Sequence, residues 1–220
     1  MKKGIKLCLL VAIACMGLVF MPYARTNDDW EYWMKYSFGA RVNENVNLFV
    51  KPQLRWRDDM NEFYFHRTWA GATLRVLKWL EVAPQYAYKT SKQKGNHWLS
   101  ENCLALDLMP KIRLGSLKIS DRNRVMYNFK YYILTYRNRI KIARPFKNLL
   151  WGYGLTPFIA DEGFYNDQVH EFYENRVEFG LGTKITRNIG LDLSYIYRSK
   201  ENKDKWSNSH ILSSLIKLKF

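Results

Sequence analysis

The chain has 220 residues, a formal net charge of +15 and 16% aromatic residues. This length suits one ordinary domain or one barrel of moderate size. A strongly basic chain can bind nucleic acid or anionic lipid, but the Lys and Arg residues here recur at alternate positions of successive segments instead of forming one basic stripe. The pattern therefore argues against nucleic acid as a partner and favours a basic interior lined by strands.

The N-terminal segment has the layout of a secretory signal peptide. Three lysines within the first six residues precede an apolar run from Leu7 to Met21, and polar residues follow from Arg25. We expect a cleavable signal peptide over residues 1–24 and a single mature domain over residues 25–220. Lipidation at Cys15 is an alternative. An uncleaved anchor is another, although about fifteen apolar residues are few for a membrane-spanning helix.

From Trp30 onward, strand-length segments alternate apolar and polar residues, and polar turns separate them. Between Val46 and Arg57, every second residue from Val46 onward is apolar, while Lys51, Gln53 and Arg55 point to the other face. The predicted strands cover residues 30–41, 46–57, 63–76, 80–91, 98–112, 117–129, 133–143, 151–162, 170–184, 189–198 and 209–220.

These segments predict an all-β protein, which we interpret as a transmembrane antiparallel β-barrel. A sheet that spans a membrane must close, because open strand edges cannot face lipid. Short turns alternate with longer polar connections, as in outer-membrane barrels. A soluble sandwich with one solvated face would show the same alternation and is the alternative. The segments number eleven, but bacterial barrels have an even number of strands, so we expect ten or twelve.

The last predicted strand favours the membrane barrel. One of its faces is apolar, while Lys217 and Lys219 lie on the other. The pattern resembles the C-terminal targeting strand of bacterial outer-membrane barrels, whose terminal aromatic residue is recognised by the barrel-assembly machinery. We therefore expect the bacterial outer membrane as the location, with membrane lipids and this machinery as partners. The expected assembly signal is Leu212, Ile216, Leu218 and Phe220.

Two Arg-x-Arg pairs lie on neighbouring predicted strands. In the antiparallel register that their connecting turn implies, Arg122 faces Arg139 and Arg124 faces Arg137. An arginine that faces lipid at mid-depth costs about 2–4 kcal/mol, so these four side chains must line the lumen. Like charges there need carboxylate partners, and Glu101 and Asp192 are among the inward candidates. The expected lumen charge cluster is Arg122, Arg124, Arg137, Arg139, Glu162, Glu174, Arg176 and Glu178.

This cluster has two interpretations, a path for anions or a charge network that plugs a narrow barrel. Side chains fill the interior of small barrels. We therefore expect a structural or narrow, charge-plugged barrel without catalysis, and a small anion-selective channel is the alternative.

The same residues resemble a family of bacterial outer-membrane barrels catalogued as domain of unknown function 2490. The resemblance covers most of the mature chain and implies the barrel fold and its location, with no assigned activity. Met126 stands where the family pattern has an acidic residue, so one charge partner must come from elsewhere. The matching residues are Arg122-Asn123-Arg124, Arg137-Asn138-Arg139, Phe158 to Phe164, Asn175-Arg176 with Gly180, Tyr195, and His210 to Phe220.

The runner-up function is hydrolysis of outer-leaflet lipid. Two barrel-borne enzymes, the outer-membrane phospholipase and the lipid A deacylase, use His and Ser two residues apart on an outward strand. The sequence contains no His-x-Ser, and Ser209 and His210 are the candidate nucleophile and base, although strand neighbours face opposite sides. It also contains no His-Glu-x-x-His, phosphate-binding loop or Gly-x-Ser-x-Gly motif, so we expect no metal and no cofactor.

Overall fold

The computed structural model describes residues 29–220 except 94, 151–152, 169–170 and 203–204. The expected signal peptide and Cys15 lie outside the described residues. Among the described residues, no helix has the length and apolar character needed to cross a membrane. The strands are β1 (Asp29–Arg41), β2 (Val46–Arg57), β3 (Glu62–Leu77), β4 (Leu80–Lys92), β5 (Trp98–Leu114), β6 (Leu117–Asn128), β7 (Ile133–Ala143), β8 (Phe146–Leu150), β9 (Tyr153–Asn166), β10 (Glu171–Lys184), β11 (Ile189–Asn202) and β12 (Lys205–Lys219).

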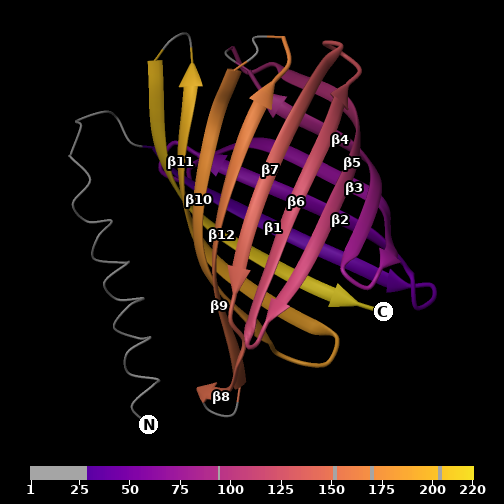
Figure 1. Cartoon of the computed structure of the whole chain (residues 1–220). Coiled ribbons are helices and arrows are strands. Elements are labelled where there is room, and N and C mark those ends of the chain that lie inside the picture. Colours follow the sequence, from indigo (N-terminus) through magenta and orange to yellow (C-terminus); the bar gives the residue numbers. More distant parts are fainter. Residues whose placement is uncertain (1–28, 94, 151–152, 169–170, 203–204) are drawn as a thin grey trace.

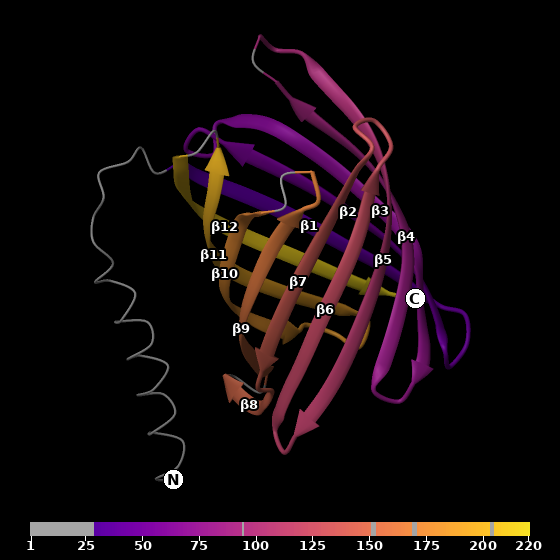
Figure 2. The ribbon, with the colours of Figure 1, turned by 45° about the horizontal axis from the view of Figure 1, so that its top comes forward.

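Eleven of these strands close into a barrel (Figures 1 and 2). The strands β1 to β7 are neighbours in chain order. β7 then pairs with β9, the order continues through β10 and β11 to β12, and β12 pairs with β1. The short β8 pairs only with β9 in the described part of the chain and adds no strand to the ring.

The expectation of ten or twelve antiparallel strands is wrong. When every sequential neighbour is antiparallel, an odd number of strands brings the first and last strands together in the same direction. The β1–β12 pair is accordingly parallel, with Asp29 opposite Ser209 and Gly39 opposite Lys219. The count of eleven alternating segments was correct. The expectation moved to ten or twelve because bacterial barrels generally have an even number of strands.

The wall of the barrel has apolar residues outside and a mixed interior. Leu104, Leu181 and Leu193 point outward and are 50%, 53% and 54% exposed. Among the residues that the structure describes, fifteen hydrophobic and fifteen polar or charged ones are buried. A soluble sandwich would instead bury a mostly apolar core and expose polar residues, so this distribution contradicts the sandwich alternative.

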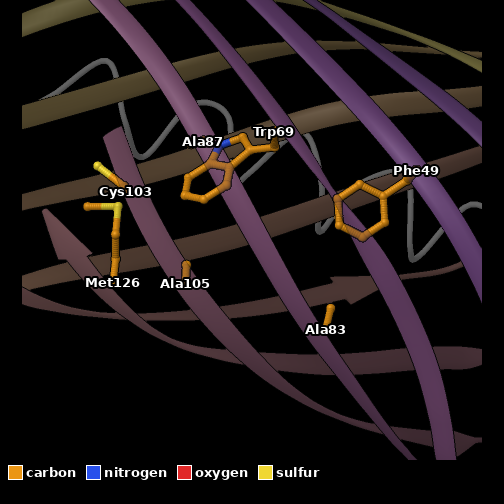
Figure 3. Packing of buried hydrophobic residues seen from close by; sticks show 7 residues of the cluster. All are labelled: Phe49, Trp69, Ala83, Ala87, Cys103, Ala105 and Met126. Atoms are coloured by element: carbon orange, nitrogen blue, oxygen red, sulfur yellow. The ribbon is translucent and has the colours of Figure 1, made fainter. Parts of the chain in front are cut away.

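Small residues on β4 and β5 make room inside the barrel for large side chains from β2 and β3. Figure 3 shows this inner apolar cluster, in which the rings of Phe49 and Trp69 lie near alanines of the adjoining strands β4 and β5. Both rings are under 10% exposed. The lumen is therefore filled by side chains on this side. The cluster consists of Phe49, Trp69, Ala83, Ala87, Cys103, Ala105 and Met126.

Candidate functional site in the barrel lumen

The two Arg-x-Arg pairs lie inside the barrel on β6 and β7. Arg122 is the register partner of Arg139, and Arg124 is the partner of Arg137, as the sequence predicted. Arg124 and Arg137 are 6% and 9% exposed, whereas the outward neighbour Val125 is 45% exposed. Strand alternation thus directs all four guanidinium groups into the lumen.

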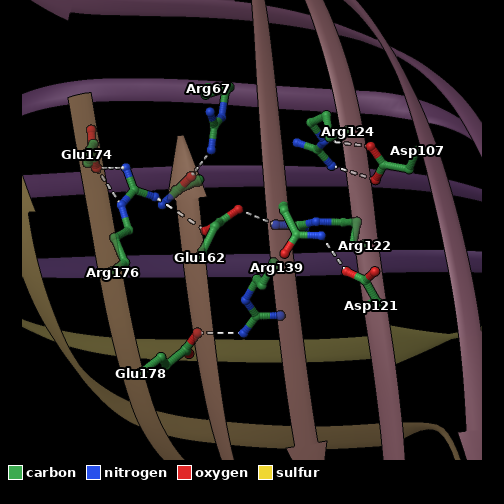
Figure 4. Close-up of polar contacts among 12 residues, drawn as sticks. Arg67, Asp107, Asp121, Arg122, Arg124, Arg139, Glu162, Glu174, Arg176 and Glu178 are labelled. Carbon is green, nitrogen blue, oxygen red and sulfur yellow. Dashed lines mark hydrogen bonds and ion pairs between the residues drawn. The ribbon is translucent and has the colours of Figure 1, made fainter. Parts of the chain in front are cut away.

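Four members of the predicted charge cluster form a continuous chain of ion pairs across β6, β9 and β10 (Figure 4). Arg122 Nη2 lies 2.5 Å from Glu162 Oε1. The other oxygen of Glu162 lies 3.8 Å from Arg176 Nη1, and Arg176 Nη2 lies 2.5 Å from Glu174 Oε1. Both carboxylates are under 10% exposed, so the chain is a buried network that needs all its partners.

The partner that Met126 left unassigned is Asp107 on β5. Arg124 donates two hydrogen bonds to the Asp107 carboxylate, from Nε at 2.6 Å and from Nη2 at 2.8 Å. Such a two-pronged pair is stronger than a single neutral hydrogen bond. Arg139 Nη2 lies 2.6 Å from Glu178 Oε2. The two other carboxylates with inward parity also form ion pairs, Glu101 with Lys89 and Asp192 with Lys217.

Arg137 differs from the rest of the predicted cluster. It forms no ion pair within the described part of the chain, and its guanidinium carbon lies 4.7 Å from the ring centroid of Phe164. A cation over an aromatic face is an attractive contact, and its strength grows when water is excluded. Arg137 is therefore held by packing instead of by a carboxylate.

This contact is one step of an arginine–aromatic stack that crosses the lumen. Guanidinium groups and rings alternate along it, with each guanidinium carbon 3.8–5.6 Å from the centroid of a neighbouring ring. Seven strands contribute, and the rings of Trp33 and Phe164 are only 2% and 1% exposed. Packed side chains thus cross the lumen at this level. In order of contact, the stack contains Arg137, Phe164, Arg176, Trp33, Arg55, Phe65, Arg67, Trp69 and Arg124.

The lumen-facing arginines of β6, β7 and β10 were predicted from the sequence. The contacts of this stack and the part that Arg55, Phe65 and Arg67 play in it were not. The available signal was parity, because Trp33, Arg55 and Phe65 all fall on the inward face of their strands. Their mutual contacts depend on how the strands are staggered around the barrel, which local spacing does not specify.

Ser209 and His210 do not form a pair. Ser209 is 6% exposed inside the lumen, and its hydroxyl accepts a hydrogen bond from Arg198 Nη2 at 2.9 Å. His210 points outward, where its Nδ1 lies 2.6 Å from the Tyr195 hydroxyl and its ring stacks on Trp30. Adjacent strand residues face opposite sides, so these two cannot act together as nucleophile and base.

Another hydroxyl and imidazole do meet on the outer face. Thr68 Oγ1 lies 3.0 Å from His66 Nε2 on β3. Both residues face outward, since Tyr88, the register partner of Thr68, is 42% exposed. A motif with serine as the hydroxyl misses this pair, and His-x-Thr on an outward strand is the signal that would have found it.

The described part of the chain places no three His, Cys, Asp or Glu side chains together in a way that could hold a metal ion.

On β12, the expected face assignment is confirmed for two residues. Leu212 is 41% exposed on the outside, and Lys217 Nζ reaches Asp192 Oδ2 at 2.5 Å inside.

A closed barrel with an apolar outer wall and a lumen crossed by charged and aromatic side chains defines the class of this protein. The family described as "Protein of unknown function (DUF2490)" matches residues 30–209. The chain therefore belongs to this family, and the match covers the Arg-x-Arg pairs that carried the resemblance.

A solved structure, "LpxR from Salmonella typhimurium", is similar in fold, with a TM-score of 0.52. The similarity covers 84% of this chain and 87% of that chain, at 10% sequence identity. At this identity, the likeness supports a shared β-barrel fold. No curated protein matches the chain.

Proposed function

We propose that this protein is a barrel of the bacterial outer membrane whose lumen is plugged by charged and aromatic side chains, with a structural role and no catalysis. The arginine–aromatic stack supports this proposal, because the rings of Trp33 and Phe164 within it are nearly fully buried. The ion pairs around it hold the guanidinium groups in place, as expected for a narrow barrel filled by its own side chains.

The outer wall supports placement in a membrane. Exposed leucines, valines and isoleucines cover it, and a contiguous apolar surface of this extent is unsuited to water. Outward aromatic residues gather at the end where β1 begins, with Trp56 5.5 Å from Phe63 and Phe63 5.6 Å from Trp98 between ring centroids. Aromatic girdles of this kind lie at the interface between lipid and water.

The first prediction concerns location and assembly. The protein should fractionate with the outer membrane and migrate faster on a gel unheated than boiled, because a closed barrel resists detergent. We propose that the apolar face of β12 with Phe220 is the signal read by the barrel-assembly machinery. Phe220→Ala should then lower the fast-migrating fraction in cells, whereas Lys219→Ala should not. Recovery of the wild type in the soluble periplasm would contradict the membrane barrel.

Lipid hydrolysis is the second candidate, and the hydrogen bond between His66 and Thr68 is the observation that favours it. The pair lies on the lipid-facing side, within reach of an ester bond in the bilayer. The same hydrogen bond also satisfies two polar groups that would otherwise be unpaired in lipid, which is a sufficient structural reason for it.

The second prediction separates these roles of His66 and Thr68. Solubilised wild-type protein, supplied with phospholipid or lipid A, should release no fatty acid, as measured by mass spectrometry. Hydrolysis that is abolished by His66→Ala and by Thr68→Val, but retained in His210→Ala, would establish the second candidate in place of the first. Thr68→Val keeps the volume and removes the hydroxyl, so it is the informative change.

A further inference from the structure

Two adjacent cavities lie inside the barrel between the arginine–aromatic stack and the end that carries Phe220. The first, which we call the inner chamber, has a volume of about 370 Å³ and has stack members such as Trp33 and Arg137 in its wall. The second, the mouth, has a volume of about 540 Å³ and is lined by Phe220 and the β1–β2 turn. The two cavities share Ser37, Lys51 and Lys217 in their linings, so they are adjacent.

The inner chamber carries far more positive than negative charge. Eleven Lys and Arg side chains line it, against four Asp and Glu side chains. Each of the four carboxylates already has a cationic partner, and of the remaining chamber cations Arg176 is paired with Glu162 and Glu174. The four pairs are Asp107 with Arg124, Glu162 with Arg122, Glu178 with Arg139, and Asp192 with Lys217.

Three lysines of the chamber lack a carboxylate partner. Within the described residues, Lys35, Lys51 and Lys141 form no ion pair. Two of them rest on aromatic rings, with Lys51 Nζ 3.6 Å from the centroid of Phe49 and Lys141 Nζ 3.4 Å from that of Phe158. Their ammonium groups therefore keep donors for a ligand in the chamber.

Buried guanidinium groups provide an independent observation. Arg55 and Arg137 are 7% and 9% exposed and line the chamber. The Nε atom of each has no hydrogen-bond partner among the described residues. The hydrogen bond that Arg55 donates among the described residues goes to Gln53 at 3.4 Å, and a buried donor left unpaired destabilises the fold.

We propose that the inner chamber binds a multivalent oxyanion of the phosphate class, which enters through the mouth. Guanidinium and ammonium groups bind phosphate oxygens through charge-assisted hydrogen bonds, and such a ligand would neutralise cations that repel one another in a lumen poor in carboxylates. The chamber lies within the usual range of small-molecule sites, about 300–1,000 Å³. This inference rests on the proposed plugged barrel, because the stack closes the far side of the chamber and the anion binds without passing through.

Calorimetric titration of the refolded full-length barrel in phosphate-free detergent, with inorganic pyrophosphate at constant ionic strength, tests this proposal. We expect saturable binding that sodium chloride does not reproduce. Lys51→Met and Lys141→Met should each weaken it by about tenfold, the effect of one lost charge-assisted contact. Lys78→Met, in the exposed β3–β4 turn, is the matched control and should bind as the wild type does. The gel shift on heating verifies that each variant is folded.

Several outcomes would overturn the proposal. A titration without saturable heat would do so. Equal pyrophosphate affinity in Lys51→Met, Lys141→Met and Lys78→Met would also do so, because it would indicate screening of surface charge. Binding of short-chain phosphatidic acid but not of pyrophosphate would assign the site to a lipid headgroup.

Conductance in planar bilayers is a separate measurement. A conducting wild type would contradict the plug without altering the calorimetric result, so the two failures are distinguishable.

Discussion

Trp33→Ala is expected to open the barrel to ions and to lower its resistance to heat. The Trp33 ring is 2% exposed, lies between the guanidinium groups of Arg55 and Arg176, and donates from Nε1 to Glu31 at 2.7 Å. Removing a buried tryptophan costs about 3–5 kcal/mol and leaves a cavity, here in the middle of the closed layer. Planar-bilayer recording should detect steady conductance, and the unheated gel band should be lost at a lower temperature.

Trp30→Ala is the matched control for this substitution. Trp30 lies on the same strand but is 41% exposed on the outer face, so Trp30→Ala should cause no conductance in planar bilayers. A wild type that already conducts steadily with a preference for anions would contradict the plug. The arginines would then line an open path, and the anion-selective channel would be the better description.

Arg124→Ala should have the second large effect. It leaves the Asp107 carboxylate, 4% exposed, without its two hydrogen bonds. Removing one partner of a buried pair typically costs about 3–5 kcal/mol, which water in the lumen would reduce. Arg137→Ala leaves no carboxylate unpaired and should lower heat resistance less, through its lost contact with Phe164. Both variants open a gap in the stack and should leak ions, as measured by the same recording.

Lys111→Ala is the control for the ion pair. Lys111 pairs with Glu81, but its side chain is 47% exposed, and pairs at such positions contribute only about 0–1 kcal/mol. A double variant, Asp107→Leu with Arg124→Met, removes both charges and should recover most of the heat resistance. Equal losses of heat resistance in Arg124→Ala and Lys111→Ala would show that burial of the Arg124–Asp107 pair does not determine its contribution to stability.

The strands and their faces could be predicted because alternation extends along almost every segment. The segments 46–57 and 133–143 match β2 and β7 residue for residue. The register of the Arg-x-Arg pairs was also accessible, because a short connection between β6 and β7 determines which residues face each other. The strand ends were less accessible. β11 continues to Asn202 and β12 begins at Lys205, both through polar residues that were interpreted as a loop, β9 extends to Asn166, and the short β8 was not predicted.

The contacts across the lumen could not be predicted in the same way. Arg176 on β10 meets Trp33 on β1, two strands that are not neighbours in the sheet. Such contacts depend on the diameter and stagger of the barrel, which follow from the strand count. A barrel of ten or twelve strands has a different diameter and stagger from one of eleven. The stack could therefore not be predicted, although each of its residues had the correct inward parity.

The parallel pairing of β1 with β12 determines the order in which the barrel can form. Antiparallel neighbours are joined by short turns and can pair as soon as both are made, whereas Asp29 and Ser209 are separated by most of the chain. Until they meet, both strands are edges with unpaired amide and carbonyl groups, which the interior of a membrane does not tolerate. For the membrane barrel proposed above, the growing sheet must therefore be shielded at two edges until β1 and β12 pair, so this parallel pairing is expected to be the last step of insertion.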